Sequence, residues 1–230
     1  MDKRISLFSL FFLFSCILIL SGFILFFQIG ESQKPFDKNI YVNLLERLRQ
    51  KHKLLPMRQY FSLGKPADVA VLTHDVDYKV EGLKALTLVE KEFNVRSTIF
   101  IRFDAYYLTQ NLAYFQQLER EGWEIGFHYD SLSRTNGNMT EALKLFQSQL
   151  AFFRSYFNIS SVSYHGDVEY DVATFNGNLY LENIDLFHEW GLRERLEVEG
   201  EYIADTNHNL KIPQEFESVV VVNFHSDWWS

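Results

Sequence analysis

The 230-residue sequence contains a single cysteine, Cys16, and comparatively few lysines and arginines. Because Cys16 lies inside an apolar N-terminal run, neither a disulfide framework nor a thiolate metal site is available to the rest of the chain. Any metal site must therefore use histidines and carboxylates. Acidic residues outnumber basic ones by 30 to 22, and no cluster of lysine and arginine occurs, which argues against a nucleic-acid-binding surface.

Aromatic residues are abundant instead, at 17% of the sequence, while charged residues make up 23%. This composition is typical of a globular core and excludes low-complexity disorder. The length that remains after the apolar N-terminus suits one domain better than two. We therefore expect a single core and a ligand without net negative charge.

Residues 5–27 carry no charged side chain. At a rise of ~1.5 Å per residue, a helix of this length crosses the ~30 Å hydrocarbon layer of a bilayer. We expect an uncleaved transmembrane anchor, because the apolar stretch is too long for a signal peptide and is not followed by a small-residue cleavage site. Lys3 and Arg4 precede it, so the N-terminus should be cytoplasmic and the remainder periplasmic, extracellular or luminal.

The chain divides into three expected parts: a cytoplasmic tip with the anchor over residues 1–29, a stalk with a leading helix over 30–66, and a catalytic domain over 67–230. Apolar and β-branched runs predict strands at 68–73, 94–101, 123–128, 161–165 and 217–225. Helical spacing of apolar residues predicts helices at 39–51, 80–93, 111–121 and 140–157, the last with Thr140 as its N-cap. Alternating strands and helices favour a parallel sheet or a β/α barrel, in which sites lie at the carboxyl ends of the strands.

Histidine and aspartate recur at the ends of predicted strands. The four segments are Thr73-His-Asp-Val-Asp77, Phe127-His-Tyr-Asp130, Tyr164-His-Gly-Asp167 and Phe224-His-Ser-Asp227. Because the carboxyl ends of parallel strands meet at one edge, we expect these groups to converge into a metal or acid/base site. One or more of the aspartates two positions beyond a histidine is expected to orient an imidazole. The alternative is that these are ordinary turn, capping and strand-end residues.

These segments resemble motifs of the polysaccharide deacetylase superfamily, the NodB-like carbohydrate esterases. The segment that ends at Asp77 is similar to the family's Thr-Phe-Asp-Asp-Gly motif, which supplies a catalytic base and a metal ligand. The resemblance implies that Asp75 is the base and Asp77 the ligand. Since Val76 occupies the place of the second aspartate, the sequence leaves open an exchange of these two roles. Gly122-Trp-Glu-Ile-Gly-Phe-His128 resembles the run that carries the family's first histidine ligand.

The chain also departs from the family pattern. Leu132 stands where the second histidine of the His-x-x-x-His motif is expected, and the Arg-Pro-Pro-Tyr-Gly-like segment is absent. His165, at the position of that absent segment, is our candidate for the missing ligand. His225 ends the last predicted strand and resembles the family's general acid. The residues expected to contact substrate are Arg102, Trp228 and Trp229.

The resemblance implies a distorted (β/α) barrel of the polysaccharide deacetylase type, preceded by one transmembrane helix. It also implies a divalent metal, with zinc expected and cobalt, nickel or manganese as alternatives. The reaction would be removal of acetyl from an N-acetylated sugar of a polysaccharide, glycolipid or cell-surface glycan. Two other functions stay open. One is a catalytically inactive carbohydrate-binding relative, suggested by Leu132, and the other is a hydrolase of a glycosidic or non-peptide C–N bond on a similar scaffold.

Overall fold

The structure, a computed structural model, describes residues 35–166, 187–188 and 200–229. The predicted anchor over residues 5–27 and the strand-end residue Asp167 lie outside this part of the chain. Among the helices that are described, none has the length and apolar character needed to cross a membrane.

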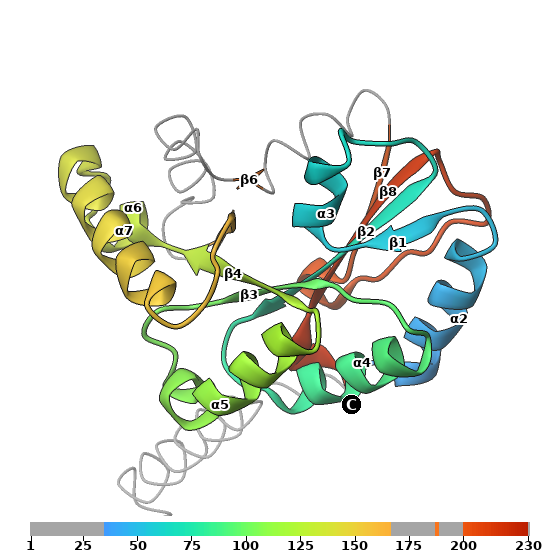
Figure 1. The fold of residues 1–230 in the computed structure, drawn as a ribbon, viewed down its shortest axis with the longest axis horizontal. Helices are drawn as coiled ribbons and strands as arrows, with labels where there is room; N and C mark the ends of the chain where they lie inside the picture. Colours follow the sequence, from blue (N-terminus) through green and yellow to red (C-terminus); the bar gives the residue numbers. More distant parts are fainter. Residues whose placement is uncertain (1–34, 167–186, 189–199, 230) are drawn as a thin grey trace, which may run out of the picture. The chain divides into compact units, whose positions relative to one another are not determined.

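Parallel strands form one curved sheet with helices packed around it (Figure 1). Its order is β6-β5-β4-β3-β2-β8-β7, and β1 pairs with the first half of β2. All residues of β2 are buried, as is typical of a central strand in a parallel sheet. The strands are β1 Lys53–Leu55, β2 Val69–Val76, β3 Thr98–Ile101, β4 Glu124–Tyr129, β5 Ser161–Tyr164, β6 Phe187–His188, β7 Glu201–Ala204 and β8 Val219–His225.

The helices that link successive strands lie close to their predicted positions. The segment 111–121 was predicted as a helix, and α5 begins five residues earlier, at Tyr106. The prediction of Thr140 as an N-cap is wrong, because the side chain of Asn138 caps α7 by accepting a hydrogen bond from the backbone N–H of Glu141. The helices are α2 Lys38–Leu48, α3 Met57–Ser62, α4 Glu81–Glu92, α5 Tyr106–Arg120, α6 Ser131–Arg134 and α7 Met139–Arg154, with 3-10 turns η2 Thr206–His208 and η3 Ser226–Trp228.

The two faces of the sheet have different partners. Ala70 and Leu72 of β2 pack in one core with α2 and α4. Val69 and Val71 point the other way and pack in a separate core with α3, on what we call the inner face. Successive residues of a strand alternate between faces, so this pattern continues to the end of β2. It directs Asp75 to the inner face.

His74 points to the opposite, outer face. Its Nε2 lies 2.7 Å from Oε1 of Glu90 in α4, and both side chains are fully buried. The Glu90 carboxylate also accepts hydrogen bonds from Tyr41, Ser97 and Trp123. Burial and the adjacent Glu90 charge raise the pKa of Tyr41 well above its usual value, so it remains a donor. The prediction that all four strand-end histidines converge is therefore wrong for His74, which instead fixes α2 and α4 to β2.

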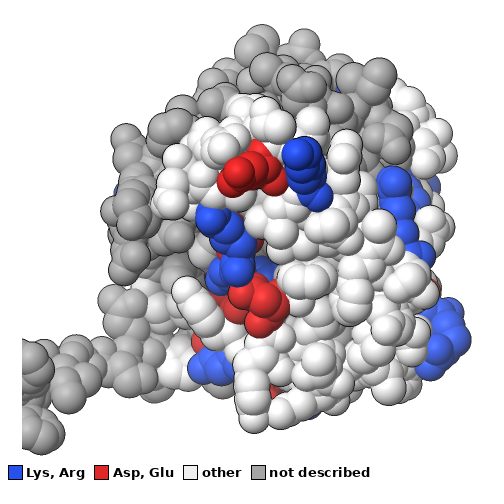
Figure 2. Space-filling model, turned by 90° about the vertical axis from the view of Figure 1, so that its left-hand side faces the viewer, with Lys and Arg blue, Asp and Glu red and all other residues white. Residues whose placement is uncertain are grey.

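Charged side chains on the side of α6 and α7 neutralise one another. Figure 2 shows this side, where acidic and basic groups adjoin in a short band and most of the described surface around them carries no charge. Arg134 of α6 forms ion pairs of 2.7 Å with both Asp104 and Asp130. Asp130 in turn pairs with Arg102 at 2.9 Å, at the edge of the sheet where the candidate site lies.

Candidate active site

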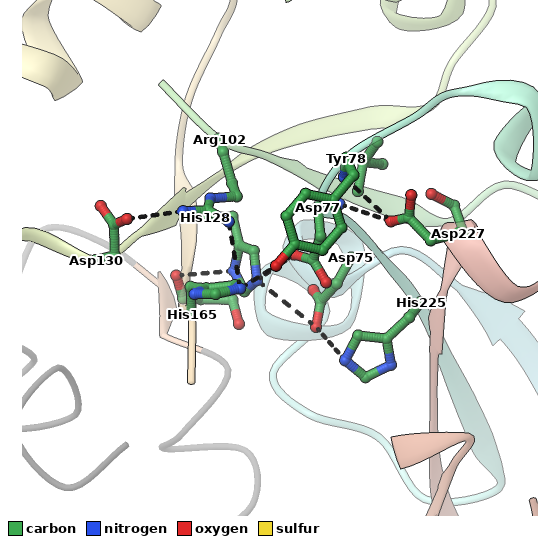
Figure 3. A network of polar contacts seen from close by, with 12 residues as sticks. Asp75, Asp77, Tyr78, Arg102, His128, Asp130, His165, His225 and Asp227 are labelled. Carbon is green, nitrogen blue, oxygen red and sulfur yellow. Dashed lines mark hydrogen bonds and ion pairs between the residues drawn. The ribbon is translucent and has the colours of Figure 1, made fainter. Parts of the chain in front are cut away.

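Neighbouring strands bring six polar residues together at one edge of the sheet (Figure 3). The register between β2 and β8 sets Asp75 beside His225, and the backbone N–H of His165 donates to Tyr129 O at the end of β4. The residues brought together are Asp75 and Asp77 at the end of β2, Arg102 after β3, His128 in β4, His165 after β5 and His225 in β8.

Asp77, His128 and His165 form a group that can hold a metal ion. One ligand atom from each lies within 4.8 Å of the others. Oδ1 of Asp77 is 3.4 Å from Nε2 of His128 and 3.6 Å from Nε2 of His165. Two atoms bound to one tetrahedral ion at ~2.0–2.1 Å are separated by roughly 3.3 Å, so these spacings fit a shared ion. Oδ1 of Asp77 is buried and makes no hydrogen bond within the described protein, which leaves it available as a ligand.

The second nitrogen of His128 is held by the backbone. Its Nδ1 lies 3.3 Å from Ser163 O, which favours the tautomer that carries the proton on Nδ1 and presents the lone pair of Nε2. Nε2 is the atom that faces Asp77. A carbonyl oxygen in this position is a common partner for a metal-binding histidine.

The charges in this group suit a cation. Burial alone would lower the pKa of His128, but the carboxylates of Asp75 and Asp77 raise it, so they favour positive charge between them. A divalent cation that displaces the proton would satisfy the same carboxylates. Burial opposes ionisation of Asp77, yet its contact with His128 and the charge of His128 hold the pKa of Asp77 well below the usual range. Burial and the charge of His128 lower the pKa of His165 to about 4, which keeps this imidazole neutral at pH 7, the form that binds metal.

Asp75 is placed beside the cluster. Its Oδ2 accepts a hydrogen bond of 2.9 Å from Nδ2 of Asn223 and lies 4.0 Å from Nε2 of both His128 and His225. Its Oδ1 is buried and makes no hydrogen bond within the described protein. Asn223 is itself oriented by Thr73, whose hydroxyl lies 3.2 Å from Asn223 Oδ1. Asp75 thus has one oxygen fixed and one free to accept a proton.

His225 has a carboxylate partner that the sequence analysis missed. Nδ1 of His225 lies 2.7 Å from Oδ1 of Asp205, and the backbone N–H of His225 donates to both oxygens of that carboxylate. Burial alone would lower the pKa of His225, but the hydrogen bond to Asp205 and the charges of Asp75, Asp205 and Asp77 raise it to about 9. His225 is therefore protonated at neutral pH, with Nε2 directed toward Asp75.

The aspartates that were expected to orient imidazoles have other partners. Asp130 pairs with Arg102 and Arg134. Asp227 accepts three backbone N–H groups in the loop that follows β2. That expectation is therefore wrong for both of these described aspartates, and Asp205 takes the role for His225.

The three residues expected to contact substrate differ in position. Trp229 is only 3% exposed and its indole N–H donates to Asp205 Oδ2 at 2.8 Å, so it packs in the core and supports Asp205. Trp228 is partly buried and stacks on the His225 ring, with centroids 4.6 Å apart. Nη1 of Arg102 lies 3.4 Å from Nε2 of His165, which places the guanidinium directly beside the metal-ligand group.

Comparison with known proteins yields matches to solved structures at low sequence identity. No protein-family model matches the chain, and no curated protein sequence matches it. The catalytic domain of peptidoglycan N-acetylglucosamine deacetylase from Eubacterium rectale is 14% identical with a TM-score of 0.48, over 70% of this chain and 78% of that one. The Xyl-CE4 domain of a multidomain xylanase from the hindgut metagenome of Trinervitermes trinervoides is 14% identical, with a TM-score of 0.44, over 67% and 72%. A mutant of peptidoglycan deacetylase PdaC from Bacillus subtilis is 15% identical, with a TM-score of 0.40, over 67% and 74%.

These structural neighbours are carbohydrate esterases and peptidoglycan deacetylases, the kind of protein that the sequence motifs resemble. The assignment of chemistry to this chain rests on its own residues and their geometry.

Proposed function

We propose that this chain is a metal-dependent hydrolase that removes the acetyl group from an N-acetylated sugar of a polysaccharide or cell-surface glycan. The proposal rests on one observation: three groups with different chemical roles lie at neighbouring strand ends. They are a ligand group of one carboxylate and two imidazoles, a carboxylate with a free buried oxygen, and an imidazole whose pKa is raised to about 9. Together they match the requirements of amide hydrolysis.

The ligand group is formed by Asp77, His128 and His165. A divalent metal bound there would supply Lewis acidity, which lowers the pKa of a bound water and polarises a carbonyl oxygen. Zinc fits this mixture of nitrogen and oxygen ligands, and cobalt, nickel and manganese are alternatives.

Proton transfers are assigned to the protein's own groups. Asp75 would accept the proton of the attacking water at Oδ1, while the hydrogen bond from Asn223 keeps the carboxylate oriented. His225 would donate its Nε2 proton to the departing amine, because Asp205 holds Nδ1 and favours the protonated form. The proposed acid and base are close enough to act on the same substrate group, since His225 Nε2 and Asp75 Oδ2 are 4.0 Å apart.

We further propose that the enzyme is a single-pass membrane protein with a cytoplasmic N-terminus and an external catalytic domain. The uncharged stretch 5–27 supports the anchor. The backbone N–H of Phe36 donates to Trp228 O, and Phe36 forms a β-bridge with Trp229. The first described residues therefore pair with the segment that directly follows His225. An enzyme anchored in this way would act on a glycan or glycolipid at the membrane surface.

Acetate release tests this function. The full-length chain, purified in detergent micelles, should release acetate from N-acetylglucosamine oligomers, lose this activity in a strong chelator and regain it when zinc, cobalt, nickel or manganese is restored. Glycan binding without acetate release under any of these metals would instead indicate a non-catalytic carbohydrate-binding protein. Release of sugar or ammonia without acetate would indicate a hydrolase of a different bond.

A further inference from the structure

Tyr78 directly follows the proposed metal ligand Asp77, and its side chain is 70% exposed. A single exposed aromatic residue has no particular meaning by itself. Tyr78 differs in two respects: Asp227 holds its backbone in place, and its ring lies near Arg102 beside the metal-ligand group.

The backbone at Tyr78 is fixed by the segment that follows His225. Asp227 Oδ2 accepts the N–H groups of Asp77 at 3.1 Å and Tyr78 at 3.2 Å, and its Oδ1 accepts that of Lys79 at 2.9 Å. The same two segments touch again at Gly82, where a Cβ would lie 1.9 Å from Ser226 O. The loop therefore presents the exposed ring of Tyr78 from a rigid support, so little entropy is lost when a ligand contacts it.

The ring lies next to the ligand group. The guanidinium carbon of Arg102 is 6.0 Å from the centroid of the Tyr78 ring, and Nη1 of Arg102 is 3.4 Å from Nε2 of His165. Figure 3 shows Tyr78 beside Asp77 at the front of this group, with His225 on the other side of Asp75. If the carbonyl oxygen of a substrate lies at the metal-ligand group, the rest of that substrate can therefore contact the aromatic face of Tyr78.

We propose that Tyr78 is a substrate-positioning residue on which the pyranose ring that carries the reacting acetamide packs; this rests on the proposed glycan substrate. The axial C–H groups of a pyranose form an apolar face that suits an aromatic ring, and the phenol hydroxyl can exchange hydrogen bonds with sugar hydroxyls. Tyrosine supplies both contacts with only two side-chain torsions to order. The expected ligand is a neutral N-acetylhexosamine residue within an oligosaccharide.

Substitution of Tyr78 tests this role by separating binding from turnover. In the full-length chain with metal supplied, Tyr78→Ala should raise KM for an N-acetylglucosamine pentamer roughly tenfold and change kcat by less than about threefold. Tyr78→Phe should restore most of the affinity, because it keeps the stacking face. Tyr156→Ala provides the control, since Tyr156 is an exposed tyrosine that follows α7 and whose ring contacts Phe152 and Phe157. Equal KM values for wild type and Tyr78→Ala, or an equal rise in the Tyr156→Ala variant, would overturn the proposal.

A direct titration keeps this test independent of the catalytic function. If the wild-type chain releases no acetate, its dissociation constant for the same pentamer is measured calorimetrically, and Tyr78→Ala should weaken it roughly tenfold. That result would uphold Tyr78 as a glycan contact while the hydrolase proposal fails. A wild-type chain that does not bind the pentamer, or one whose binding is unaffected by Tyr78→Ala, would overturn the role of Tyr78.

Discussion

Asp75→Asn is expected to lower kcat for acetate release by ~10²–10⁴-fold, the range of a lost general base. The amide keeps the shape of the carboxylate but cannot accept the proton of the attacking water. Bound metal should persist, because the ligand group consists of Asp77, His128 and His165. Steady-state kinetics and elemental analysis of the same preparations provide both measurements.

The control is Asp68→Asn, the same chemical change just before the opposite end of β2, where Asp68 is exposed and pairs with Ser218. It should leave kcat unchanged. The two aspartates at the other end can also be compared directly. Loss of metal in Asp75→Asn together with retention in Asp77→Asn would show that the base and ligand roles are exchanged.

His225→Gln is expected to lower kcat for an acetamide substrate by ~10²–10³-fold, because a departing amine needs a proton. The loss should be much smaller for an acetate ester with an acidic alcohol, whose leaving group departs without protonation. Parallel kinetics on the two substrates measure this difference. Equal losses on both would contradict the assignment of His225 as a general acid.

The pH profile tests the partner of His225. Burial alone would lower the pKa of His225, but the hydrogen bond to Asp205 and nearby carboxylate charges raise it to about 9, so the protonated form is complete well below that pH and is lost as pH rises through it. Activity should therefore fall on the alkaline side. Asp205→Asn removes one of the charges that raise this pKa and should move the alkaline limb of kcat to lower pH. If the alkaline limb of kcat stays at the same pH in Asp205→Asn, a group other than His225 controls it.

Much of the site could be predicted from the sequence because strands that end in polar residues were recognisable. β2 and β4 are buried throughout and β8 is buried between its two end residues, so the polar residues near their ends, Asp75, His128 and His225, were found. His74 was grouped with the converging strand-end residues because its position near a strand end does not show which face of the sheet its side chain lies on. The alternation along β2 does reveal it, and the same rule applied to β8 would have placed Asn223 on the face of His225.

Other features could not be predicted. Asp205 follows β7, a four-residue strand whose sequence Glu-Tyr-Ile-Ala gives no clear apolar run. Its role depends on the pairing of β7 with β8, which is a long-range contact. Trp229 was expected to line the substrate site, but its side chain is buried and its indole N–H donates a hydrogen bond to Asp205. The burial of Trp229 follows from tertiary packing, and no local sequence pattern predicts it.

The measurement that tests the central claim most directly is the amount of divalent metal bound per chain. The full-length protein, His128→Ala, His165→Ala and a His208→Ala control would be dialysed against zinc and assayed for metal and for secondary structure. We expect about one ion per chain in the wild type and the control, and loss of that ion in both folded site variants. A folded wild type that binds no ion when zinc, cobalt or nickel is supplied, or site variants that retain it, would contradict the account.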